Sequence, residues 1–114
     1  MKSIRRDIHL EPGSYTCIRL RLKAGGQPFD LSGWTARLQA RDYTRNLLID
    51  LTQDNAGIEI DPAEGEIQIN FFVSATAGIR EKTAYYDLKL IPSDPERAIE
   101  IYNGQITFGR EDCQ

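Results

Sequence analysis

Histidine, cysteine and long apolar runs are all scarce in this sequence. Its 114 residues include one histidine, two cysteines and one methionine. A zinc site needs three or four converging ligands, so the single His9 is expected to be structural or solvent-facing. No apolar stretch approaches the roughly 20 residues that a membrane-spanning helix needs. The sequence therefore predicts no metal ion, no cofactor and no contact with a membrane.

The first residues are basic but have no apolar segment behind them, so no secretory signal is expected. A protein that folds in a cytoplasm keeps its thiols reduced. Cys17 and Cys113 are therefore expected to be free thiols, and Cys113 falls in a polar C-terminal tail at about residues 110–114.

Sequence motifs typical of a catalytic site are also absent. No serine lies in a nucleophile-elbow pattern, and Cys17 has no base beside it in the sequence. Five acidic residues stand close together, but their spacing does not match a calcium-binding EF-hand loop, and they lie among residues that form turns. They are Asp50, Asp54, Asp61, Glu64 and Glu66. We expect turn chemistry from them and no enzymatic activity.

Net charge argues against nucleic acid as a partner. Lysine and arginine number 14 and aspartate and glutamate 17, so the formal net charge is -3. A nucleic-acid-binding domain normally carries a clear excess of basic residues. Hydrophobic residues make up 40% of the chain, which suffices for a folded core.

Alternation of apolar and polar residues is the dominant pattern. Residues 16–23 and 34–41 are its clearest cases, and turn residues recur about every 8–12 positions. The only segment suited to a helix is a short one near residues 74–79, from Ser74 to Ile79. The length fits one domain over residues 1–114. We predict an all-β, antiparallel sandwich of about seven to nine short strands, with at most one short helical turn.

The alternation also divides the side chains into an inner and an outer set. The predicted structural core comprises Trp34, Tyr86, Leu20, Leu38, Ile69 and Leu88. The outer set is rich in basic residues, and we interpret it either as a solvated face or as a face that docks onto an acidic partner or another subunit. Its candidate interface residues are Arg19, Arg21, Arg37, Arg41, Asp87 and Lys89.

Five short motifs follow one another in an order that resembles a known family. They are Asp30-Leu31-Ser32-Gly33-Trp34, Gly57-Ile58-Glu59-Ile60, Gly65-Glu66-Ile67, Tyr85-Tyr86-Asp87-Leu88 and Asn103-Gly104-Gln105-Ile106. This order resembles small phage and prophage structural proteins with an immunoglobulin-like domain, similar to the N-terminal domain of lactococcal-type baseplate upper proteins. The resemblance runs from about Tyr15 to Phe108.

The resemblance implies an immunoglobulin-like sandwich in which Trp34 anchors the packing. It also implies that Tyr85 or Tyr86 forms a tyrosine corner, whose hydroxyl bonds to a nearby main-chain group. This sequence has no cysteine in the Tyr86 strand, so the resemblance implies sheets held by packing alone.

The functional implication is a role in the virion, for a protein made in the bacterial host cytoplasm. Expected partners are other phage structural proteins of the tail, baseplate or fibre-attachment apparatus, and further copies in a homo-oligomer. The alternative is a module that recognises a host-surface glycan or receptor through end loops, with residues 42–46 and 102–104 as candidates.

Overall fold

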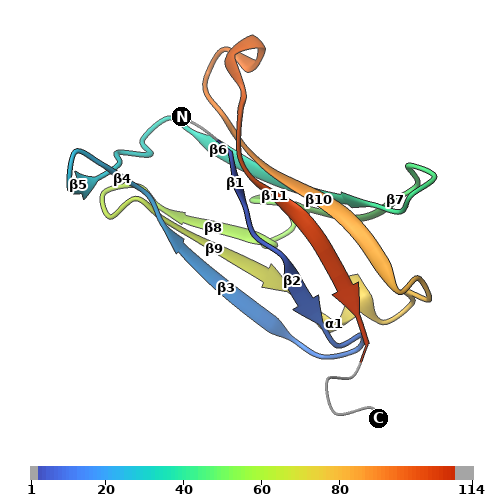
Figure 1. Ribbon diagram of the computed structural model, residues 1–114. Helices are drawn as coiled ribbons and strands as arrows, with labels where there is room; N and C mark the ends of the chain where they lie inside the picture. The colour runs from blue at the N-terminus through green and yellow to red at the C-terminus, as the bar shows by residue number, and fades with distance from the viewer. Residues whose placement is uncertain (1–2, 110–114) are drawn as a thin grey trace.

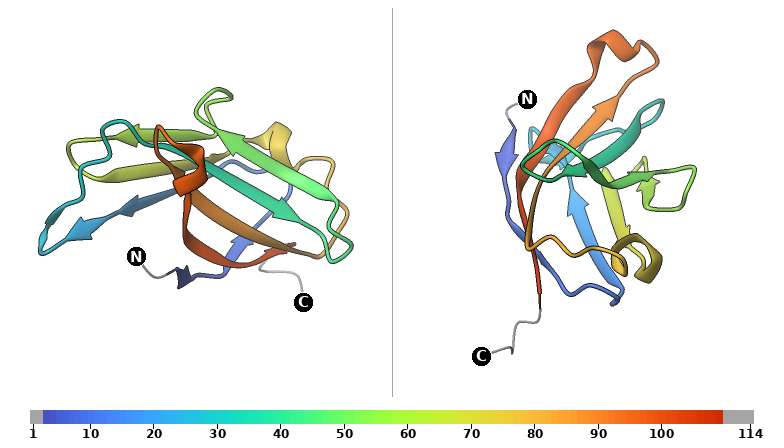
Figure 2. Two further views of the ribbon diagram at one scale, coloured as in Figure 1. Left: turned by 90° about the horizontal axis from the view of Figure 1, so that it is seen from above. Right: turned by 90° about the vertical axis from the view of Figure 1, so that its right-hand side faces the viewer.

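The computed structural model describes residues 3–109, which form two β-sheets packed face to face (Figures 1 and 2). The large sheet has the strand order β1-β11-β10-β6-β7, and β2 also pairs with β11. Its strands are β1 (Ile4–Arg5), β2 (Ile8–Leu10), β6 (Thr35–Arg41), β7 (Leu47–Thr52), β10 (Thr83–Ile91) and β11 (Ile99–Phe108). The small sheet has the order β3-β9-β8, from β3 (Thr16–Arg21), β9 (Glu66–Phe71) and β8 (Ile58–Asp61).

The remaining two strands, β4 (Lys23–Ala24) and β5 (Gln27–Pro28), form a short hairpin. Gly25 and Gly26 form its two-residue loop, and both have positive φ angles, as the tightest hairpin turns require.

Three of the eleven strands in residues 3–109 have only two residues, and eight are longer. The prediction of an all-β sandwich is therefore confirmed. One feature of it differs, because β1 and β2 run parallel to β11 while the other pairs are antiparallel.

The helical turn predicted near residues 74–79 is present, but it starts one residue earlier and ends three residues earlier. α1 (Val73–Thr76) starts before Ser74, and its N-cap residue Phe72 offers no side-chain cap. A 3-10 turn, η1 (Pro95–Arg97), reverses the chain between β10 and β11, and the Asp94 carboxylate caps it by accepting a hydrogen bond from the Glu96 N–H. No helix in residues 3–109 is long and apolar enough to cross a membrane.

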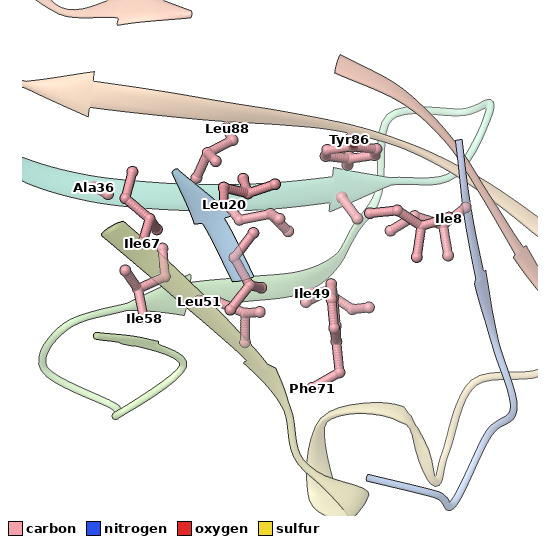
Figure 3. Close-up of a cluster of buried hydrophobic side chains, with 14 of the residues drawn as sticks. Ile8, Leu20, Ala36, Ile49, Leu51, Ile58, Ile67, Phe71, Tyr86 and Leu88 are labelled. Carbon is pink, nitrogen blue, oxygen red and sulfur yellow. The ribbon is translucent and has the colours of Figure 1, made fainter. Parts of the chain in front are cut away.

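The core lies between the two sheets and follows the alternation along each strand. In β6 and β10 every second side chain is buried, and Figure 3 shows side chains of both sheets pointing into the space between them. Five of the six predicted core residues are buried there, namely Leu20, Leu38, Ile69, Tyr86 and Leu88. Cys17 is an exposed free thiol, and Cys113 and the predicted tail lie outside the described residues.

Trp34 does not occupy the centre that the resemblance assigned to it. It precedes β6 and is only partly buried, packed against the rim of the core. Its ring meets Phe29 edge to face, with 6.0 Å between the ring centroids. Among the described residues, the largest fully buried side chain is that of Phe71, on β9.

Tyr86 ties the N-terminal segment to the large sheet. Its hydroxyl donates a 2.6 Å hydrogen bond to the Arg6 carbonyl, between β1 and β2. Gly104 lies opposite Tyr86 in the β10–β11 register, and a Cβ at residue 104 would collide with that same carbonyl. The Arg6 N–H in turn donates to the Asn103 carbonyl at 2.8 Å. The tyrosine therefore bonds to main chain as the resemblance implied, but to a segment 80 residues away.

This contact predicts a loss of stability on alkaline titration. Burial raises the pKa of Tyr86 to about 12 from its ordinary value of 10.0. Its contribution to the free energy of unfolding is therefore complete below pH 10 and is lost as the pH rises from 10 through 12. Tyr86→Phe should cost about 1 kcal/mol at pH 8 and reduce the further loss between pH 10 and 12, measured by urea denaturation.

Tyr85→Phe is the matched control, because Tyr85 is the neighbouring residue on the exposed face of the same strand. It should leave both the stability at pH 8 and the alkaline loss unchanged. Equal effects of the two substitutions would contradict the assignment to Tyr86.

Candidate interaction surfaces

The six predicted interface residues lie on two sheets rather than on one face. Arg19 and Arg21 lie on β3 of the small sheet. The other four lie on β6 and β10 of the large sheet, and are Arg37, Arg41, Asp87 and Lys89. The outer faces of two packed sheets point away from each other. The alternation identified outward residues but gave no information on which sheet each strand joins.

The outer face of the small sheet is divided by charge. Arg19 and Arg21 form its basic side on β3, and Glu59 and Asp61 form its acidic side on β8. Gln68 on β9 connects the two sides, since it accepts a hydrogen bond from Arg19 Nε and donates one to Glu59, both 3.1 Å long. Each edge of this sheet therefore carries one sign of charge.

The next row across the same sheet is joined by an ion pair. Arg21 Nε lies 3.1 Å from a carboxylate oxygen of Glu66 on β9. The Arg21 side chain remains largely exposed, and exposed ion pairs of this kind contribute little to stability. Asp61 lies beyond Glu66 in the register and is exposed. The charges of Arg21 and Asp61 are thus accessible to a partner.

The outer face of the large sheet carries an ion pair that joins two of its strands, β6 and β7. Arg37 binds Asp50 on β7 through two hydrogen bonds, of 2.9 and 2.6 Å. The bond from Arg37 lowers the pKa of Asp50. Gln39 is the β6 residue opposite Asp87 on the neighbouring strand β10. Burial raises the pKa of Asp87 above its ordinary value.

An open groove of about 420 Å³ lies at one end of this face. Two exposed tyrosines line it, Tyr43 with 86% of its surface exposed and Tyr85 with 52%, and the buried Tyr86 lies behind them. The charged side chains around them are Arg41, Asp42, Arg45, Asp87 and Glu100. Residues 42–46, one of the two loops proposed for glycan recognition, form one wall of this groove.

Asp42 organises that loop. One of its carboxylate oxygens accepts hydrogen bonds of 2.7 to 2.9 Å from the Thr44 hydroxyl, the Thr44 N–H and the Asn46 N–H. These bonds, the Thr44 hydroxyl first, lower the pKa of Asp42. Arg45 has a φ of 71°, a conformation that costs energy for any residue except glycine. The network around Asp42 thus shapes the loop that leaves Tyr43 and Arg45 exposed.

The second proposed glycan loop is not a loop. Residues 102–104 lie in the middle of β11, paired with β10. Tyr102 is partly buried against the core. Asn103-Gly104 suggested a turn because this pair is frequent in hairpins, whereas Gly104 is there to let the Arg6 carbonyl approach.

Sequence reasoning missed an apolar corner beside α1. Tyr15 stacks on Phe72, with ring centroids 5.7 Å apart, and both are substantially exposed with Val73. The Tyr15 hydroxyl donates to the buried side chain of Asn70 at 2.9 Å. The run Phe71-Phe72-Val73 was the available signal, because a strand buries only every second residue.

The candidates for metal binding or catalysis do not come together. His9 is exposed on β2, and Asp54 and Glu64 are exposed in turns. No group of three or more histidine, cysteine, aspartate or glutamate residues in the described range 3–109 is arranged to hold a metal ion.

Comparison with known proteins gives a likeness of fold. No protein-family model and no curated protein sequence matches this chain. Among solved structures, it is similar to the N-terminal domain of phage TP901-1 ORF48, with a TM-score of 0.58 and 11% sequence identity. The match covers 90% of this chain and 84% of the other. The expectation that this sequence shares the fold of a phage protein domain is confirmed.

The Asp42 network predicts how the groove wall responds to mutation and to acid. Asp42→Ala removes the acceptor of these bonds, so amide exchange at Thr44 and Asn46 should accelerate by roughly tenfold. Acid should have the same effect in the unmodified protein once the pH falls below 3.8 and through the lowered pKa of Asp42. Hydrogen-exchange mass spectrometry of this loop measures both.

Tyr43→Ala is the control, because that side chain is 86% exposed and takes no part in the network. It should leave exchange in the loop unchanged. Unaltered exchange in Asp42→Ala would contradict the role given to the carboxylate.

Proposed function

We propose that this protein is a non-enzymatic structural component of a phage or prophage particle, which assembles into or links parts of the tail, baseplate or fibre-attachment apparatus. The observation that carries the proposal is the fold likeness over 90% of the chain to a domain of a phage protein. The motif order from about Tyr15 to Phe108 is a separate argument for the same family.

The chemistry of the described residues supports a role without catalysis. The lowered carboxylate pKa values belong to groups with structural partners, such as Asp42 in its loop and Asp50 with Arg37. Asp87, whose pKa burial raises, does line the groove, but no histidine, serine or cysteine stands beside it among the described residues that form the groove. The exposed features of the molecule are sheet edges, a charge-divided face and an apolar corner, which are features of binding surfaces.

The proposal places the protein in the virion, after synthesis in the bacterial host cytoplasm. Its partners are then other structural proteins of the particle. Mass spectrometry of purified particles from the strain that carries this gene should detect the protein in constant ratio to known tail proteins. Deletion of the gene should give particles with an incomplete tail or without adsorption to host cells, as seen by electron microscopy and adsorption assays.

A plasmid copy of the gene should restore complete particles, which controls for effects on neighbouring genes. Purified particles that lack the protein, or a deletion strain with normal and infectious particles, would contradict the proposal.

A second candidate function, recognition of a host-surface glycan, is favoured by the groove beside Tyr43 and Tyr85. Sugar rings stack on exposed aromatic faces, and charged planar groups bind their hydroxyls through paired hydrogen bonds. The groove offers both, with two exposed tyrosines beside Arg41, Arg45 and Asp87. Its volume lies within the range of small-ligand sites.

Binding to an array of bacterial surface glycans tests this function. Loss of either aromatic face by Tyr43→Ala or Tyr85→Ala should weaken binding about 10-fold or more, since stacking of a ring contributes on the order of 1 kcal/mol beyond its buried area. Tyr15→Ala is a matched control, because Tyr15 is 52% exposed, as Tyr85 is, but lies outside the groove.

Binding that survives both groove substitutions, or the absence of any bound glycan, would contradict this function. The role in the particle would not be affected by either result.

A further inference from the structure

Both edge strands of the small sheet are open. β9 pairs with β3 on one side and with β8 on the other, and no further strand within residues 3–109 pairs with either of them (Figure 1). β3 and β8 are both antiparallel to β9, so they run parallel to each other. A second copy turned about an axis along the strands would therefore bring its β8 parallel to β3 of the first.

The backbone groups at the two edges fit a parallel ladder. Leu22 N–H bonds to the Gly65 carbonyl and Asn70 N–H to the Gly57 carbonyl, both at 2.8 Å. In an antiparallel ladder, the backbone N–H and C=O groups of successive residues alternately face the partner strand and face away from it. On β3, Arg19 and its second neighbours therefore direct their N–H and C=O groups outward. On β8, Ile58 and Ile60 do so.

In a parallel ladder, a residue whose N–H and C=O groups face the neighbouring strand stands opposite a residue whose own groups face away. One residue bonds to the two residues that flank its opposite number. With Arg19 opposite Glu59 of the next copy, the Arg19 N–H donates to the carbonyl of Ile58, and the N–H of Ile60 donates to the carbonyl of Arg19. A shift by one residue would place the free groups of the two strands directly opposite one another, so that they would no longer alternate as a parallel ladder requires.

The same register pairs opposite charges. Within one copy Arg19, Gln68 and Glu59 stand in one row, and Arg21, Glu66 and Asp61 stand in the next. Continuing these rows sideways places Arg19 opposite Glu59 of the next copy and Arg21 opposite its Asp61. Opposite charges on directly opposed strand residues are favourable.

The inner face is matched as well. Ile18 on β3 and Ile60 on β8 are only partly buried at the two edges of the core. In this register Ile18 stands opposite Ile58 of the next copy, and Leu20 opposite its Ile60. The contact would therefore cover apolar side chains on one face while it pairs charges on the other.

We infer that a second copy of this chain is the partner of the small sheet, and that its β8 edge binds the β3 edge of the first to extend the sheet. The inference rests on the proposed role in particle assembly and names one partner for it. A two-fold contact is disfavoured, because β3 against β3 would gather four arginines and β8 against β8 four carboxylates. The contact is heterologous, so copies continue head to tail and close into a ring where the rotation allows it.

Charge reversal on one edge at a time tests the inference. The unmodified chain should sediment as an oligomer at concentrations of about 0.5 mM and should dissociate as salt rises from about 0.05 to 0.5 M, because exposed charges are screened. Arg19→Glu with Arg21→Glu should give monomers, and so should Glu59→Lys with Asp61→Lys. An equimolar mixture of these two variants should assemble again, since each supplies the edge that complements the other.

Arg80→Glu with Lys82→Glu is the matched control. It makes the same change in net charge as the Arg19 and Arg21 pair, at two exposed residues away from both edges, and it should leave the oligomer intact. A monomeric unmodified chain at low salt, or a mixture that stays monomeric, would overturn the inference. Circular dichroism establishes that each variant is folded.

Cysteine cross-linking tests the register. In a chain with Cys17→Ser and Cys113→Ser, Arg19→Cys and Glu59→Cys lie two strands apart, about 10 Å, which is too far for a disulfide within one copy. Oxidation should therefore give a ladder of covalent oligomers on a non-reducing gel. Arg21→Cys with Glu59→Cys, displaced by two residues, should cross-link at least several-fold less, and equal yields would overturn the register.

The results separate this inference from the proposed function. A monomeric protein that is nevertheless found in purified particles would overturn the edge contact and leave the role in the particle standing. An oligomer with the predicted response to charge, but absent from particles, would support the edge contact and contradict the role.

Discussion

Apolar contact between the inner faces of the two sheets joins the halves of this protein, and the other features depend on it. Cys17 lies on the outer face as a free thiol, so it takes no part in joining the sheets. Residues such as Leu38, Leu88, Ile67 and Phe71 are instead fully buried between them. Because a strand directs only alternate side chains into the space between the sheets, the same constraint assigns every second residue to an outer surface. The candidate interaction surfaces are a consequence of this constraint.

The sequence was sufficient to predict this alternation of inward and outward side chains. It was not sufficient to predict which strands pair with one another. Leu20, Ile69 and Leu88 could be recognised as inner residues from their neighbours alone. Whether Arg19 and Arg37 share a face depends on which sheet each strand joins, which is decided by contacts between distant segments. Trp34 shows a related limit, since its size and spacing suggested a central anchor, whereas its place before β6 leaves it at the rim.

Long-range polar contacts were equally inaccessible from the sequence. The bond from Tyr86 to Arg6 joins residues 80 positions apart. The need for glycine at residue 104 is explained only by the close approach of the same Arg6 carbonyl. Local chemistry was easier to interpret. Residues 42–46 contain the polar side chains that form their own network around Asp42, and this loop was selected correctly as an exposed end of the sandwich that presents a tyrosine.

Charged residues on an edge strand normally prevent sheets from joining one another. Arg19 and Arg21 alone would be explained in that way, as would Glu59 and Asp61. The two pairs stand in the same rows of one sheet and at opposite edges, so the charges that repel a like edge attract the unlike one. An arrangement that blocks indiscriminate pairing can therefore also select a single mode of pairing. In a particle built from repeated copies, such selection fixes both the neighbour and its orientation, with two charges and a few backbone groups at each edge.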